Sequence, residues 1–150
     1  MYGQEQNKRE QILEEYTADV ERLLKYLPWM MNKQAKDVSS FYEGDAEHKL
    51  VKIPVYDSTL LAFVKEAEKT KLVNKYYPYT YTRYKIKTVE DEKNLIEKAT
   101  LFDIDLLKGI LSKYVLLGKT KSVVWSDAVG NGIFVAILAK LDRVFHTNGN

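Results

Sequence analysis

The residues with the clearest chemical potential lie at positions 74–87, where the chain reads NKYYPYTYTRYKIK. Five of the protein's eleven tyrosines and four basic residues fall in this stretch, and none of its residues is acidic. Tyrosine rings stack on flat ligands or bury apolar surface, while lysine and arginine bind phosphates and carboxylates. We therefore predict a ligand or partner patch that contains Tyr77, Tyr79, Tyr81, Arg83, Tyr84 and Lys85.

Two geometries are open for this stretch. In a strand, every second residue from 77 to 87 shares one face, which gives an aromatic and basic ribbon suited to single-stranded nucleic acid. In a helix, Pro78 fits the first turn, and Tyr77, Tyr81 and Tyr84 share one face that makes an ordinary core contact. The β propensity of Tyr and Thr favours the strand, but packing is the commoner use of aromatic side chains.

A second group of polar and aromatic residues lies nearer the carboxyl end. Asp127 and Asn131 are four positions apart, so they share one face of a helix that begins near Ser122 or Ser126, beside Trp125. This face marks either a polar groove or a solvated surface. We include Trp125, Asp127 and Asn131 among the candidate ligand or partner residues.

Motifs for catalysis are absent from the sequence. The two histidines, His48 and His146, lie outside any metal-ligand or nucleophile motif, and there is no cysteine to serve as a thiolate. Asp103 and Asp105 bracket a helix start, where capping and the helix dipole already account for them. We expect no catalytic residue, no metal site and no cofactor.

The charge of the chain is nearly balanced, with a formal net charge of +2. This balance argues against a protein whose whole surface is built for nucleic acid. The positive charge is concentrated in residues 75–87 and in a basic segment, residues 108–121, where Lys108, Lys113, Lys119 and Lys121 meet no acid. No apolar run is long enough to cross a membrane, and the opening residues carry no apolar signal core, so we expect a cytoplasmic protein without a membrane partner.

The periodicity of the apolar residues predicts a mainly α fold with a small β-hairpin (α+β), in a single compact domain over residues 1–150. We expect about five to six helices, with residues 1–5 and 147–150 disordered. Asp57 or Ser58, Thr88 and Asp103 are the expected caps of helices, and Gly118 is expected to end one in a left-handed conformation. The first expected element is a helix whose pattern runs from about Gln6 to Met31, and Pro28 should either stop it near Leu27 or set off a short separate turn with Trp29 and Met30. A two-stranded antiparallel hairpin is expected near residues 38–56 with Gly44 in its loop, followed by helices beginning near Ser58, Thr88, Asp103 and Ser122.

The carboxyl-terminal half resembles a family of uncharacterised bacterial proteins, a domain of unknown function. The resemblance is carried by residues 84–87, 106–115, 118–125, 128–133 and 137–141. It implies a tyrosine-containing segment, a helix, a turn marked by glycine and aromatic residues, and a closing amphipathic helix. The family's arginine-acid-arginine-aromatic run has no counterpart at residues 114–121. Because the family has no assigned reaction, the resemblance implies a fold and not an activity.

Three classes of function fit these residues. The first is a small interaction or accessory domain without catalytic activity, which binds a protein partner or self-associates through Trp29, Trp125 or the tyrosine stretch. The alternative is a nucleic-acid-binding module that uses residues 75–87 and 108–121. An enzyme with a carboxylate or tyrosine acid-base site is the third class, and the sequence favours it least.

Overall fold

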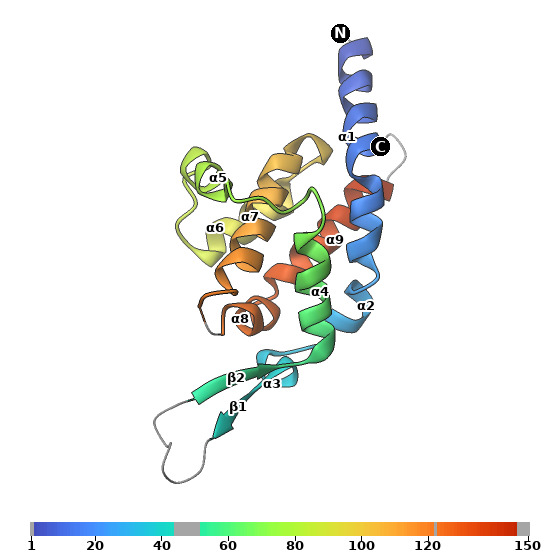
Figure 1. Ribbon diagram of the computed structural model, residues 1–150. Coiled ribbons are helices and arrows are strands. Elements are labelled where there is room, and N and C mark those ends of the chain that lie inside the picture. Colours follow the sequence, from blue (N-terminus) through green and yellow to red (C-terminus); the bar gives the residue numbers. More distant parts are fainter. Residues whose placement is uncertain (1, 44–51, 122, 147–150) are drawn as a thin grey trace.

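A computed structural model describes residues 2–43, 52–121 and 123–146, and shows a mainly helical protein with one antiparallel hairpin (Figure 1). The predicted fold class is confirmed. The described part holds more helices than expected, because it includes short helices of one or two turns and because the last segment, residues 124–146, divides into two helices. The elements are α1 (Tyr2–Leu24), α2 (Leu27–Met30), α3 (Ala35–Val38), β1 (Ser39–Glu43), β2 (Lys52–Tyr56), α4 (Ser58–Glu68), α5 (Tyr77–Arg83), α6 (Val89–Lys98), a 3-10 turn (Leu101–Asp103), α7 (Ile104–Leu117), α8 (Val124–Gly130) and α9 (Ile133–His146).

The amino-terminal half follows the expected order of elements. Pro28 lies in the first turn of α2, which forms the separate turn predicted at Trp29 and Met30. Helix α1 begins at Tyr2, so it includes residues 2–5, and the prediction that these residues are disordered is wrong. Strands β1 and β2 pair from Ser39 with Tyr56 to Glu43 with Lys52, which confirms the hairpin. Gly44 and His48 of the predicted loop, and residues 147–150, lie outside the described residues.

Helix α9 is central to the hydrophobic core, and α1, α2, α6, α7 and α8 pack against it (Figure 1). Its apolar residues recur at three- and four-residue steps, which bury one broad face. Phe134 is fully buried and meets the rings of Phe63 at 5.1 Å and Tyr114 at 6.2 Å, both edge to face. In the described ranges no single helix is long and apolar enough to cross a membrane, and α8 and α9 reach that length only together, across a 63° bend.

Local capping explains several helix ends, with two corrections. Asp57 and Thr88 cap α4 and α6 as predicted. Asp103 precedes α7 but makes no side-chain cap there, and its carboxylate instead accepts hydrogen bonds from Thr100, the residue before the 3-10 turn. Gly118 ends α7 with a right-handed φ of −65° and not in the expected left-handed conformation. Its lack of a side chain makes room for Trp125, since a Cβ there would lie 2.0 Å from the indole nitrogen.

Val123, which precedes α8, has a φ of 65°. A β-branched residue in the left-handed region is strained, at about 1–2 kcal/mol for an L-residue. The Tyr56 hydroxyl accepts a hydrogen bond of 2.8 Å from the Val123 amide and holds this conformation. We expect Val123→Gly to raise the free energy of unfolding by about 0.5–1 kcal/mol in urea titration. Val124→Gly, one position later in the helix, should instead lower it by about 1 kcal/mol, and equal losses at both positions would contradict the strain.

His146 ties the end of α9 to α1. One ring nitrogen contacts Asp142 at 2.6 Å and the other contacts Glu21. These two hydrogen bonds and the two carboxylate charges raise the pKa of His146 above its usual value of 6.5. A pKa that is higher in the folded state stabilises the protein below the unfolded pKa, and this stabilisation is lost as pH rises through the folded pKa. We expect the stability advantage of the wild-type protein over His146→Gln to be larger at about pH 6 than at about pH 9, as measured by urea unfolding at both pH values. An advantage that does not change with pH would show that the contact is not ionic.

Candidate functional site

The tyrosine stretch forms helix α5 and the residues beside it, so the helical alternative is the one observed (Figure 1). Pro78 lies in the first turn. Tyr77, Tyr81 and Tyr84 are half-buried, and the last two pack against the core as the predicted inward face. Tyr76 and Tyr79 point outward, with 59% and 75% of their surface exposed and their ring centroids 6.5 Å apart.

The segment that leads into α5 is fixed by side chains from two other helices. In α7, Ser112 donates to the Leu72 carbonyl and accepts from the Asn74 amide at 3.0 Å. The Asn74 side chain then accepts from the Tyr76 amide at 2.9 Å. Buried backbone groups need such partners, and here they also determine where the exposed tyrosines begin.

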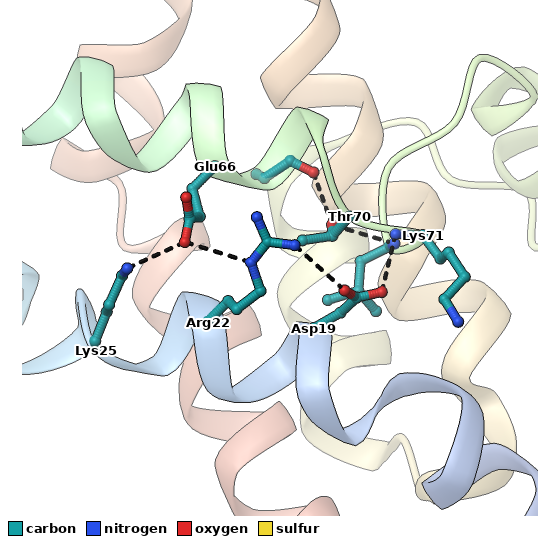
Figure 2. Close-up of polar contacts among 8 residues, drawn as sticks. Asp19, Arg22, Lys25, Glu66, Thr70 and Lys71 are labelled. Atoms are coloured by element: carbon teal, nitrogen blue, oxygen red, sulfur yellow. Dashed lines mark hydrogen bonds and ion pairs between the residues drawn. The ribbon is translucent and has the colours of Figure 1, made fainter.

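The second support for this segment comes from α1, as Figure 2 shows. Asp19 accepts a hydrogen bond from the Lys71 amide at 3.0 Å, just past the end of α4. Arg22, one turn further along α1, and Lys25, just past the end of this helix, both reach Glu66 of α4, at 3.4 Å and 3.0 Å. The hydrogen bond from Lys25 and the two positive charges lower the pKa of Glu66. This charged cluster clamps α1 to α4, and its groups are occupied with one another.

A groove of about 240 Å³ lies between α5 and α7. We call it the α5–α7 groove, and it is lined by Asn74, Tyr76, Tyr79, Thr80, Arg83, Tyr84, Asp105, Lys108 and Gly109. The helices approach closely at one point, where a Cβ on Gly109 would lie 2.5 Å from the Thr80 methyl group. Glycine at this position of α7 therefore lets α5 lie close enough to form the wall of the groove.

The charge in and beside this groove is mostly positive. Arg83 lines it, and the exposed Lys75, Lys85 and Lys87 flank α5. Lys108 is less accessible because its ammonium donates to the Tyr16 hydroxyl at 2.7 Å and lies 4.8 Å from the centre of that ring. Asp105, 73% exposed at the side chain, is the acid in the groove lining.

The predicted patch is thus divided by the structure. Tyr79, Arg83 and Tyr84 line the groove, whereas Tyr77 and Tyr81 face away from it and Lys85 stands outside the lining. Lys85 has a φ of 56° and turns the chain out of α5. The lining is completed by six residues that were not among the predicted patch residues: Asn74, Tyr76, Thr80, Asp105, Lys108 and Gly109.

A buried polar cluster lies behind α5. The Glu92 carboxylate of α6, only 1% exposed, accepts hydrogen bonds from the hydroxyls of Tyr81 and Tyr114, both at 2.5 Å. The Lys113 ammonium lies 3.3 Å from the same carboxylate and over both tyrosine rings. Three helices, α5, α6 and α7, therefore meet at one buried negative charge with three donors.

This cluster has the groups of an acid-base site, but its carboxylate is too buried for a substrate to reach. Burial, together with the hydrogen bond to Glu92, raises the pKa of both Tyr81 and Tyr114, so both phenols remain protonated donors. A substrate has almost no surface of Glu92 to contact. The arrangement is that of a satisfied structural network, in which each donor has an acceptor.

The other predicted residues do not join the tyrosines. Asp127 and Asn131 line a separate hollow with Gln34 and Lys36, and Asn131 accepts from the Ile133 amide at the start of α9. Trp125 faces a different, mostly apolar hollow beside α4 and donates to the Val115 carbonyl at 3.1 Å. The structure therefore places the predicted residues at three surfaces.

The basic segment 108–121 does not form one patch either. Three of its four lysines are engaged with other groups: Lys108 with Tyr16, Lys113 with Glu92, and Lys119 with Glu68 at 3.0 Å. These partners come from α1, α6 and α4, on different sides of α7. In the part of the chain that the structure describes, no three His, Asp or Glu side chains gather as a metal site would require.

Sequence reasoning missed Glu92 because it lies in the acidic first turn of a helix, where carboxylates ordinarily cap and remain solvated. One signal for its burial was present. Glu92 precedes Leu95 and Ile96 by three and four positions, which places it on the inner face of α6.

Comparison with known proteins gives no relative: no family model, curated protein or solved structure matches the chain. The resemblance of the carboxyl-terminal half to an uncharacterised family stays a prediction.

Proposed function

We propose that this protein is a non-catalytic interaction domain that binds an acidic segment of a partner protein in the α5–α7 groove. The observation that carries the proposal is the pair of outward tyrosines, Tyr76 and Tyr79, beside Arg83 at the rim of a hollow. Tyrosine and arginine are the residue types on which protein interfaces concentrate their binding free energy. Large exposed rings on a short, well-supported helix lose little conformational freedom when a partner binds.

The charge of the groove supports an acidic occupant. Residues 75–87 hold four basic side chains and no acid, and the cations at 75, 83, 85 and 87 are exposed. Opposite charge across an interface steers the encounter and excludes wrong partners. The groove has the size to accept one or two side chains, so the partner segment would insert an aromatic or aliphatic residue between Tyr76 and Tyr79 and place its carboxylates near Arg83.

A displayed library of random peptides, selected on the wild-type protein, tests the proposal. We expect the selected peptides to be rich in Asp and Glu around one large apolar residue. In fluorescence anisotropy, their affinity should fall about tenfold or more with Tyr79→Ala or Arg83→Glu, as is typical of interface anchors. Lys36→Glu, a charge reversal at a different hollow, is the matched control and should change affinity by less than about twofold. Peptides without acidic enrichment, or equal binding to Arg83→Glu, would overturn the proposal.

Single-stranded nucleic acid is the second candidate, favoured by the same exposed cations beside stacked rings. Asp105 in the groove lining and the engagement of Lys108, Lys113 and Lys119 weigh against it. Anisotropy of labelled single-stranded DNA and RNA at low and physiological salt separates the two candidates. Binding that weakens by orders of magnitude with salt and depends on Tyr79 would favour nucleic acid, whereas absence of binding at low salt would leave the protein partner.

A further inference from the structure

Helix α5 depends on contacts with neighbouring helices for its position. It has seven residues, and within the described structure none of its side chains is fully buried. A helix of this length is not stable by itself, so its position depends on tertiary contacts. Two such contacts are the close approach of Thr80 to Gly109 and the hydrogen bond from Tyr81 to Glu92.

The Tyr81 contact is the stronger of the two. Among the described residues, Tyr81 is the side chain of α5 that hydrogen-bonds to another helix, and its acceptor is a buried carboxylate. A hydrogen bond to an ionised group is shorter and about twice as strong as a neutral one. The Lys113 ammonium, 4.7 Å from the centre of the Tyr81 ring, adds a second attraction to the same side chain.

Tyr81 and the groove lie on opposite sides of α5. Tyr79, Thr80 and Arg83 line the groove, while Tyr81 faces α6 and α7. If α5 turns or lifts away from α7, the wall formed by Tyr79 and Thr80 moves with it. A contact that fixes Tyr81 would therefore also fix this wall of the groove.

We infer that the Tyr81–Glu92 hydrogen bond is a latch that holds α5 against α7, so that Tyr81 and Glu92 are positioning residues for the α5–α7 groove although neither lines it. The part of this inference that concerns binding rests on the proposed function. The part that concerns α5 itself does not.

Hydrogen exchange of the α5 backbone amides in the whole protein tests the latch directly. Tyr81→Phe removes one hydroxyl and keeps the ring, so we expect exchange in α5 to rise by about tenfold or more relative to exchange in α9. Tyr77→Phe is the matched control, because it removes a hydroxyl from the same helix outside the groove lining, and should change α5 exchange by less than about twofold. Unchanged α5 exchange in Tyr81→Phe would overturn the inference.

A third variant separates a latch from a general loss of stability. Tyr114→Phe removes the other phenol from Glu92, but Tyr114 lies in α7 and not in α5. We expect it to speed exchange in α5 and α9 by the same factor. A specific rise in α5, equal to that of Tyr81→Phe, would show that the whole cluster supports α5 and would overturn the assignment to Tyr81.

Binding of the selected acidic peptides gives the second readout. We expect Tyr81→Phe to weaken binding by about threefold to tenfold, since part of the population then lacks a formed groove. If α5 exchange rises and no acidic peptide is ever selected, the latch stands and the proposed function fails. If acidic peptides bind and Tyr81→Phe changes neither exchange nor affinity, the proposed function stands and the latch fails.

Discussion

Replacing Leu138 with alanine should lower the free energy of unfolding by about 2–5 kcal/mol. Leu138 lies in the middle of α9 and is fully buried, as is its neighbour Ile137. Removing a large side chain from such a position loses its transfer free energy and leaves a cavity that the surrounding helices fill only in part. Because α1, α6 and α7 all pack on α9, no single helix can move into the space without leaving another contact.

Urea denaturation monitored by circular dichroism measures this loss. Ile137→Ala should cost a similar amount, because Ile137 is equally buried. Leu61→Ala is the matched control: Leu61 lies in α4 with 41% of its surface exposed, and its replacement should cost less than about 1 kcal/mol. Losses below 1 kcal/mol at both core positions would show that α9 is not part of the core.

The core helix could be predicted because its signal is local. Apolar side chains recur at helical spacing through residues 133–145. In a small protein, a helix with this pattern is stable when its apolar face is buried in the core. The caps at Asp57 and Thr88 and the two-stranded hairpin were readable for the same reason. In each case the residues that decide the structure are within a few positions of one another.

Predictions failed where a distant residue decides the outcome. Gly118 has the sequence position of a left-handed helix end, but its φ is right-handed, and a glycine is needed there because the indole of Trp125 packs over it. Asp103 is the exception, because the residue that occupies its carboxylate, Thr100, is only three positions away. The choice between helix and strand at residues 76–86 was open because it depends on Gly109 and Glu92, which supply the surface that receives α5.

The candidate site was partly visible in the sequence. Composition drew attention to the tyrosine stretch, and Tyr79, Arg83 and Tyr84 do line a groove. Composition could not separate the inward rings from the outward ones, because that depends on the phase of a helix whose partner lies elsewhere in the chain. Trp125, Asp127 and Asn131 were grouped by proximity along the chain, and the structure assigns them to two other hollows.

Glu92→Ala should be among the most destabilising single changes in the protein, at about 3–5 kcal/mol. The carboxylate is buried and accepts from Tyr81 and Tyr114 while it pairs with Lys113. Its removal leaves the two phenol donors without their acceptor in a site that water barely reaches, so the cost of removing these hydroxyls from water is no longer offset by a hydrogen bond. Glu90→Ala, an exposed position of the same helix, is the control and should cost only a few tenths of a kcal/mol, as is usual at the surface.

A combined variant tests the reason for this loss. If the cost of Glu92→Ala arises from stranded donors, then replacing the whole hydrogen-bonded set with apolar groups should restore most of the stability. We expect Glu92→Leu together with Tyr81→Phe and Tyr114→Phe to unfold at a higher urea concentration than Glu92→Ala alone. If the triple variant is instead less stable than the single one, the cluster stabilises the fold through attraction and not merely through satisfied burial. Lys113, which is 31% exposed at the side chain, can turn toward water in both variants and so does not confound the comparison.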